Sequence, residues 1–158
     1  PLGDKRILDL YSGAGNFSIP LSVLSKEVVA VEENPNAVED GKRNLMINGI
    51  KNCTFINSPV ERLFGNKKMQ KNAKLFNDSA YDIIILDPPR AGLTPECIRR
   101  IMETNSRKIV YVSCNPATLA RDMKKMAERY EIESLRMIDF FPNTYHIEAL
   151  AFLDLKGF

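Results

Sequence analysis

The 158-residue sequence is poor in the residues that hold small proteins together covalently or through metal ions. Its three cysteines, Cys53, Cys97 and Cys114, stand far apart, and the chain has a single histidine. An odd number of cysteines at this spacing builds neither a disulfide framework nor a zinc site. We therefore expect no metal centre, and we expect free thiols in a reducing, cytoplasmic environment.

Long hydrophobic runs and a strong net charge are also absent. No apolar segment approaches the roughly 20 residues that span a bilayer, and no signal-peptide pattern opens the chain, so we expect no contact with a membrane. A net charge of +2 is too small to identify a nucleic-acid partner by itself. Basic residues cluster within 67–74 and within 121–129, which is more typical of solvated surface than of a binding site.

The length and the 44% hydrophobic content fit one folded domain that covers residues 1–158. Within it, strand-like and helix-like segments alternate. The predicted strands are 6–10, 27–32, 53–57, 81–87, 108–113, 132–139 and 148–155. Helices are predicted from about 17, over 35–48, 59–63 and 95–104, and from 116, with asparagine caps at Asn34 and Asn115. The lysine-rich stretch 65–79 is predicted to be a surface loop with some local helix.

This alternation implies right-handed crossover connections and parallel strand pairing. The two last strands have no helix between them, which favours an antiparallel pair at the end of the chain. We therefore predict an α/β fold with a doubly wound, mostly parallel seven-stranded sheet and an antiparallel C-terminal edge strand. Because the first strand begins almost at once, we expect the chain to be a fragment of a longer protein.

Two glycines follow the first predicted strand, in the segment LDLYSGAGNF at residues 8–17. Gly13 and Gly15 allow the backbone to turn sharply and to come close to a ligand. A dinucleotide-binding loop would add a third glycine where this chain has Ser18. Glu32 ends the next strand, where an acid accepts hydrogen bonds from ribose hydroxyls. S-adenosylmethionine has a ribose but no phosphate, so the loop fits it, while an NAD site is weakened but stays open.

Asp87 follows the most apolar segment of the chain and opens the sequence DPPR. The two prolines make this strand end rigid, and Asp87 lies at the carboxyl edge of the sheet, where ligands of open α/β sheets bind. Methyltransferases that act on amino groups place an aromatic residue after the two prolines, to stack on the target base. Arg90 stands there instead, which argues against methylation of adenine N6 or cytosine N4. A plain tight turn is the alternative.

Cys114 lies at the end of the next strand and therefore at the same edge of the sheet as Asp87. It directly precedes a predicted helix N-terminus, whose free N–H groups favour a thiolate. A single cysteine in a domain of this size is usually a buried packing residue, but its place at this strand end favours a reactive role. Cys53 and Cys97 have no comparable setting, and we interpret both as structural.

Three segments resemble the RNA uridine-C5 methyltransferases that act on transfer RNA and large-subunit ribosomal RNA. They are SCNPATLARD at 113–122, which is highly specific, LDPPRAG at 86–92 and FFPNTYHIE at 140–148. The resemblance covers essentially the whole chain, as the C-terminal catalytic domain of that family. It implies a class I (Rossmann-like) S-adenosylmethionine-dependent methyltransferase fold. It also implies methyl transfer from S-adenosylmethionine to C5 of a uridine in tRNA or 23S-type rRNA, through a covalent bond between Cys114 and C6.

The resemblance assigns roles to single residues. Cys114 takes the position of the nucleophile, and Glu148, two residues after His146, takes that of the base that removes the C5 proton. Together with the glycine loop, the implied cofactor-binding residues are Tyr11, Gly13, Gly15, Glu32, Asn57 and Asp87, with Asn57 on the adenine side. RNA is the expected partner and DNA is not. Full-length relatives carry further N-terminal RNA-binding regions, and some hold an iron–sulfur cluster there.

Three other functions are weighed against this one. RNA cytosine-C5 methyltransferases carry a cysteine at the acid-proline strand end, which the sequence DPPR lacks. A catalytically silent RNA- or protein-binding domain on the same scaffold would be favoured by the loss of Cys114 or Glu148, and both are present. An NAD-dependent oxidoreductase would need a hydride-transfer site, and we identify none.

Overall fold

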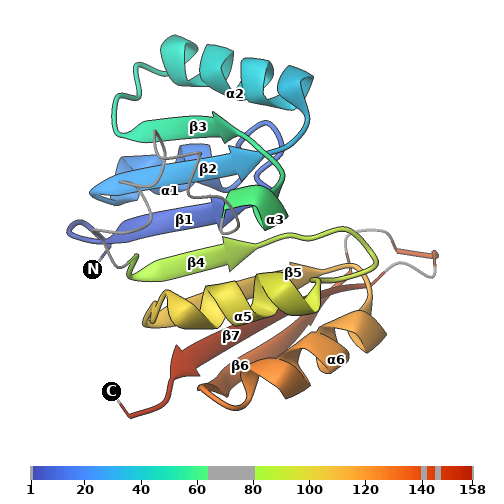
Figure 1. Ribbon diagram of the computed structural model, residues 1–158. Coiled ribbons are helices and arrows are strands. Elements are labelled where there is room, and N and C mark those ends of the chain that lie inside the picture. The colour runs from blue at the N-terminus through green and yellow to red at the C-terminus, as the bar shows by residue number, and fades with distance from the viewer. Residues whose placement is uncertain (1, 64–80, 140–141, 145–146, 158) are drawn as a thin grey trace.

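A computed structural model describes residues 2–63, 81–139, 142–144 and 147–157. Helices and strands alternate along the chain (Figure 1). The strands are β1 (Arg6–Leu10), β2 (Glu27–Glu32), β3 (Cys53–Asn57), β4 (Ile83–Leu86), β5 (Lys108–Ser113), β6 (Tyr130–Ile138) and β7 (Glu148–Leu155). The helices are α1 (Ser18–Leu24), α2 (Pro35–Ile47), α3 (Val60–Leu63), α5 (Pro95–Glu103) and α6 (Pro116–Met126). The predicted loop at 65–79 lies outside the described residues.

One seven-stranded sheet runs through the molecule, in the order β3-β2-β1-β4-β5-β7-β6. Strands β1 to β5 pair in parallel. Strand β7 runs antiparallel to both β5 and β6, and its arrow in Figure 1 points against those of β1 to β4. The predicted doubly wound, mostly parallel sheet with an antiparallel C-terminal strand is therefore confirmed. The C-terminal strand is not itself the edge strand that was predicted, because β7 lies between β5 and β6 and β6 forms the outer edge.

Two strands differ slightly from their predicted bounds. Strand β4 begins at Ile83 because the carboxylate of Asp82 turns to the N-terminal end of β1, where it accepts hydrogen bonds from the Lys5 ammonium (2.8 Å) and the Arg6 N–H (2.9 Å). Strand β6 begins at Tyr130, which pairs with β7 and whose buried hydroxyl donates to the Ser106 carbonyl oxygen at 2.8 Å. Both are terminal differences that leave the sheet order unchanged.

Hydrophobic side chains pack on both faces of the sheet. On one face, helices α3, α5 and α6 bury residues such as Cys97, Ile101 and Met126 against the strands. On the other, α1 and α2 cover the β1–β3 part, where Val38 and Leu45 pack against Phe55. Asparagines 34 and 115 cap α2 and α6 with proline at the first helical position, as predicted. Among the described residues, no helix is long and apolar enough to cross a membrane.

Candidate active site

The carboxyl ends of the parallel strands bring the predicted site residues to one edge of the sheet. Tyr11 directly follows β1, Glu32 and Asn57 end β2 and β3, and Asp87 and Cys114 follow β4 and β5. Because β7 is antiparallel to β5, its first residue lies at the same edge, and that residue is Glu148. Residues that are far apart in the sequence thus lie at one edge of the sheet, the edge at which ligands of open α/β sheets bind.

The glycine loop is fastened to the end of β2 by the carboxylate of Glu32. One oxygen, Oε2, accepts a hydrogen bond from the Gly13 N–H at 2.9 Å, and the other, Oε1, accepts from the Asn34 N–H at 2.8 Å. Each carboxylate oxygen can accept a second hydrogen bond. Glu32 therefore holds the loop in place and still has acceptor capacity for a bound ligand.

The two loop glycines serve different purposes. Both have positive φ, 53° at Gly13 and 94° at Gly15, a conformation that favours glycine. A Cβ at Gly13 would meet nothing within 4 Å, so its backbone faces open space. A Cβ at Gly15 would lie 2.8 Å from the Phe55 ring and 3.0 Å from Ile19. Gly13 is therefore open to a ligand, whereas Gly15 is buried and allows the loop to pack on β3.

Ser18, at the position where a dinucleotide-binding loop has its third glycine, makes a buried contact that the sequence did not reveal. Its hydroxyl donates to the carboxylate of Asp9, which is completely buried in β1. Desolvation by burial, opposed by this hydrogen bond and assisted by the carboxylates of Asp87 and Glu32, raises the pKa of Asp9 to about 7. The only signal in the sequence is an acid within the otherwise apolar end of strand β1, RILDL.

Beneath the loop lie two buried polar atoms that have no hydrogen-bond partner within the described part of the chain. They are Oδ1 of Asp9 and the hydroxyl oxygen of Ser12. Buried polar groups are nearly always satisfied in folded proteins. A polar ligand or a water molecule at the glycine loop would satisfy them.

Tyr11 adopts a left-handed backbone conformation, with φ of 63°, which is uncommon for a residue with a Cβ. Its hydroxyl donates to Oε1 of Glu61 at 3.2 Å and lies 3.8 Å from the sulfur of Cys97. Desolvation by burial raises the pKa of the Tyr11 hydroxyl above its ordinary value, so it stays protonated. Tyr11, Glu61 and Pro89 are among the residues that line a cavity of about 200 Å³ at the sheet edge.

Asn57 holds the backbone that carries Glu32. Its amide nitrogen donates to the carbonyl oxygens of Glu32 at 3.1 Å and Glu33 at 3.0 Å. Both amide hydrogens are then engaged, so Asn57 would contact an adenine through its side-chain carbonyl oxygen.

The second group of residues at the edge consists of Asp87, Cys114 and Glu148. Strands β5 and β7 pair with Ser113 opposite Ala149, and one further step in this antiparallel register leads to Cys114 and Glu148. Asp87 follows β4, which pairs with β5, and so lies at the same edge. Desolvation raises its pKa, and the negative charge of Glu148 raises it as well. The structure therefore brings the predicted nucleophile, the predicted base and the acid of the DPPR segment together. His146 and its neighbour Tyr145 lie outside the described residues.

The three cysteines differ in the way expected from the sequence. Cys114 is partly exposed, whereas Cys53 and Cys97 are buried. Burial raises the pKa of the Cys53 thiol to about 12 and that of the Cys97 thiol to about 12. Both are held as neutral packing residues, which leaves Cys114 as the accessible thiol. In the described part of the chain, no group of three or more histidine, cysteine or acidic side chains could hold a metal ion.

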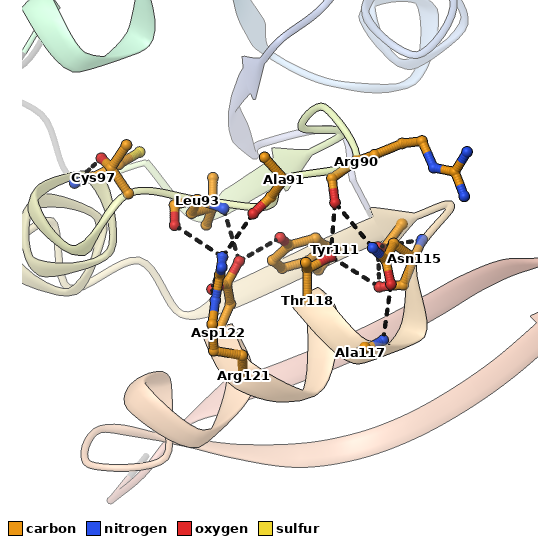
Figure 2. A network of polar contacts seen from close by, with 12 residues as sticks. Arg90, Ala91, Leu93, Cys97, Tyr111, Asn115, Ala117, Thr118, Arg121 and Asp122 are labelled. Carbon is orange, nitrogen blue, oxygen red and sulfur yellow. Dashed lines mark hydrogen bonds and ion pairs between the residues drawn. The ribbon is translucent and has the colours of Figure 1, made fainter.

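Side chains of α6 bind the loop that follows β4 (Figure 2). The carbonyl oxygen of Arg90 accepts hydrogen bonds from the Asn115 amide and the Thr118 hydroxyl, both at 3.2 Å. Further along, Arg121 and Asp122 contact the loop at Ala91 and Leu93. Asp122 and Arg121 belong to the segment SCNPATLARD, but neither was identified as a functional residue from the sequence.

Comparison with known proteins identifies relatives over almost the whole chain. The sequence profile of the family described as "tRNA (Uracil-5-)-methyltransferase" matches residues 3–156. The 23S rRNA (uracil(1939)-C(5))-methyltransferase RlmD of Klebsiella pneumoniae is 39% identical over 154 residues, which are 97% of this chain and 34% of that protein. An uncharacterized RNA methyltransferase of Fusobacterium nucleatum is 39% identical over 156 residues, 98% of this chain and 32% of that protein. The chain thus spans about a third of the length of these curated relatives.

Solved structures agree on the fold. The tRNA (uracil-54, C5)-methyltransferase of Pyrococcus abyssi, in complex with S-adenosyl-L-homocysteine, has a TM-score of 0.79 and 36% identity, covering 96% of this chain and 34% of that one. An rRNA methylase of Streptococcus thermophilus has a TM-score of 0.72 at 17% identity, covering 98% of this chain and 89% of that one, and shows the fold alone. The predicted class I, Rossmann-like methyltransferase fold is confirmed.

Proposed function

The chain belongs to the tRNA (uracil-5-)-methyltransferase family, and on that basis we propose that it is the catalytic domain of a longer RNA methyltransferase. The proposed reaction transfers a methyl group from S-adenosylmethionine to C5 of a uridine in RNA. The observation that carries this proposal is the meeting of Cys114 and Glu148 at the sheet edge that also holds the glycine loop.

The glycine loop fits S-adenosylmethionine. Glu32 has acceptor capacity left for two ribose hydroxyls after its bonds to Gly13 and Asn34. The open space over Gly13 admits a ligand, and the neighbouring Ser12 hydroxyl has no hydrogen-bond partner within the described part of the chain. The residues that would hold the cofactor are those predicted, namely Tyr11, Gly13, Glu32, Asn57 and Asp87. Gly15 would act indirectly, through the packing of the loop.

Cys114 is the proposed nucleophile. C5 of uracil reacts poorly with a methyl donor, but addition of the Cys114 thiolate at C6 gives C5 the character of an enolate. S-adenosylmethionine, when bound, supplies the methyl group that C5 then takes up. The partial exposure of Cys114 ahead of the α6 N-terminus supports this role, because the sulfur can reach a base that has been turned out of its stack.

Glu148 is the proposed base. After methylation, C5 still carries its proton, and that proton must leave before the C6–sulfur bond can break and release the thiolate. The family resemblance assigns the role of base to Glu148, and the position of Glu148 beside the end of β5 supports this assignment. Asp87, whose pKa is raised in part by Glu148, lies within the reach of the same site.

The proposed partner is RNA, either tRNA or large-subunit rRNA. Both kinds of substrate occur in the names of relatives with similar identity, 39% for the RlmD protein and 36% for the tRNA enzyme. Since these relatives are about three times as long as this chain, we propose that recognition of the particular uridine lies largely outside residues 1–158. We also propose that the protein acts in the cytoplasm.

The test is methylation of bulk RNA by the full-length protein, followed by nucleoside analysis. We expect 5-methyluridine as the product. Formation of 5-methylcytidine would instead favour a cytosine-C5 enzyme, and no methylated product would favour a silent binding domain. A calorimetric titration with S-adenosylhomocysteine and with NAD separates a methyltransferase from an oxidoreductase, since only the first ligand should bind.

A further inference from the structure

We propose that Arg121 and Asp122 are positioning residues that clamp the loop 87–93 onto α6 and thereby set the rate at which Cys114 adds to the target base. This inference rests on the proposed function, because it concerns the same reaction. It differs from that function in naming a part of the molecule that touches neither substrate nor cofactor.

Asp122 has an unusual setting for a charged residue in a helix. It is completely buried, and its Oδ2 accepts hydrogen bonds from the Leu93 N–H at 2.8 Å and the Tyr111 hydroxyl at 2.9 Å. Its Oδ1 accepts from the Nε of Arg121 at 2.9 Å. A buried carboxylate is costly unless it is fully bonded, and an apolar residue would pack as well. The carboxylate is therefore explained by the donors around it, one of which is the Leu93 N–H of the loop.

Arg121 completes the clamp from the surface. Its Nη2 lies 2.8 Å from Oδ1 of Asp122 and also donates to the carbonyl oxygens of Ala91 at 2.8 Å and Leu93 at 3.2 Å. The planar guanidinium can serve the carboxylate and the loop carbonyls at once, which a lysine ammonium on a flexible stem does poorly. Figure 2 shows Arg121 and Asp122 reaching from α6 to this loop.

The loop comes so close to the clamp that it requires a glycine. Gly92 has φ of 74°, and a Cβ there would lie 2.5 Å from Oδ2 of Asp122 and 2.6 Å from Nη2 of Arg121. The other part of the loop is bound nearer the helix start, where Asn115 and Thr118 donate to the Arg90 carbonyl oxygen. The loop is thus held at two places along α6.

The clamp connects the two segments that carry Asp87 and Cys114. Asp87 begins the loop, and Cys114 directly precedes α6, so every bond between loop and helix restricts how these two residues can move relative to each other. Rates of reactions in enzyme sites depend steeply on such placement, and a shift of 1 Å costs up to about 100-fold. A clamp that served stability alone would influence unfolding but would leave the rate of thiolate addition unchanged.

The test compares Arg121→Lys with Arg129→Lys in the full-length protein. Arg129 is a matched control, because it also donates to a carbonyl oxygen, that of Met102 at 2.8 Å, but lies beyond the C-terminal end of α6. The measured quantity is the single-turnover rate of covalent adduct formation with RNA containing 5-fluorouridine, at saturating RNA and cofactor. We expect Arg121→Lys to lower this rate by about 100-fold and Arg129→Lys to leave it within twofold.

Four accompanying measurements separate positioning from folding. The melting temperature should change by a similar small amount in both variants, and affinity for S-adenosylhomocysteine and alkylation of Cys114 by iodoacetamide should stay at the wild-type level. Hydrogen exchange at the Leu93 amide, which Asp122 binds, should become faster in Arg121→Lys alone. Thr118→Val removes one bond to Arg90 without changing any charge, and we expect a rate loss on the order of 10-fold.

Two results would overturn the proposal, and they are distinct. If the wild-type protein forms an adduct and Arg121→Lys forms it equally fast, the clamp has no positioning role, and the proposed function stands. If the wild-type protein methylates no uridine and forms no adduct, the proposed function fails and the clamp inference falls with it.

Discussion

In the first half of the chain, the loop at the sheet edge is held by side chains that stand at strand ends, whereas in the second half it is held by side chains of one helix and its N-cap. Around β1 and β2, the glycine loop is bound through its own N–H at Gly13 to the carboxylate of Glu32. Around β4 and β5, the loop 87–93 is bound by the side chains of α6, with Arg121 and Asp122 contributing the most bonds. The same edge of one sheet is thus built in two ways.

The difference suits the two tasks proposed for the halves. Binding of a cofactor needs a loop of fixed shape, which positive-φ glycines and backbone hydrogen bonds provide. Addition to a base and its later release need several side chains that are placed relative to one another, which a network of side-chain contacts provides. Substitutions in the first half should therefore act on affinity and stability, and those in the second half on rates.

The largest effect is expected at Glu148 in the second half. Glu148→Gln should leave cysteine addition and methyl transfer possible but stall removal of the C5 proton, so a methylated covalent protein–RNA adduct should accumulate. Turnover should fall by about 1,000-fold, within the range for loss of a general base. Mass spectrometry of the adduct and steady-state rates measure the two quantities.

Asp154→Asn is the control for this variant, because Asp154 lies at the other end of β7, where it pairs with Lys108 at 2.6 Å. Its turnover should stay at the wild-type level. Normal turnover of Glu148→Gln, or an adduct that lacks the methyl group, would remove Glu148 from the role of base.

The two glycines of the first half provide a matched pair for stability. Gly15→Ala combines a positive φ with a clash against Phe55 and Ile19, and we expect a loss of about 3 kcal/mol in the free energy of unfolding. Gly13→Ala has the positive φ but open space around it, and we expect a loss of about 1 kcal/mol. Denaturant unfolding measures both. Equal losses would mean that Gly15 has no packing role.

Glu32 tests whether the first half determines affinity. Glu32→Ala should weaken S-adenosylmethionine binding by on the order of 1.5–3 kcal/mol, because the ribose hydroxyls lose charge-assisted hydrogen bonds and the glycine loop loses its anchor. Glu27→Ala, at the opposite end of β2, removes a contact with Arg6 at 2.7 Å, and this variant should bind the cofactor normally. Calorimetry compares the two variants, and equal affinities would exclude Glu32 as the ribose ligand.

The last effect is a pH dependence of stability that arises in the first half. Since the folded-state pKa of Asp9 is raised from 3.8 to about 7, the folded protein keeps a proton that the unfolded chain has released. The stability from that proton is fully present below the unfolded pKa and is lost as the pH rises towards 7. Relative to Asp9→Asn, the wild-type protein should lose roughly 2–3 kcal/mol between pH 5 and pH 7. A constant difference in urea unfolding across this range would contradict the assignment.

The two halves also differed in how far the sequence alone predicted them. Local patterns were sufficient to place the glycine loop and Glu32 at strand ends and to predict the asparagine caps, because neighbouring residues determine where strands end and helices begin. The contacts that were missed join buried side chains to partners that no local pattern relates to them, at separations of 9 and 29 positions. Asp9 binds Ser18 within a buried interior, and Asp122 binds Leu93 across 29 positions. No periodicity or motif spacing records such pairs.

The position of β7 is the clearest case. The sequence predicted two final strands but did not predict that the second would insert beside β5. This insertion places Glu148 beside the end of β5, which Cys114 directly follows. Glu148 was therefore assigned by resemblance to a family and not by geometry. Strand order depends on the packing of the whole sheet, which short stretches of sequence do not contain.

Covalent attack by Cys114 is the central claim, and mapping of the trapped adduct tests it most directly. The full-length protein is incubated with S-adenosylmethionine and RNA that contains 5-fluorouridine, whose fluorine cannot leave as a proton and so traps a working nucleophile. We predict that the wild-type protein forms a stable adduct whose cross-linked peptide contains Cys114, and that Cys53→Ser forms the same adduct. Cys114→Ser should form no adduct and should not methylate RNA, but it should still bind the cofactor. An adduct on another residue, or substantial methylation by Cys114→Ser, would contradict the account.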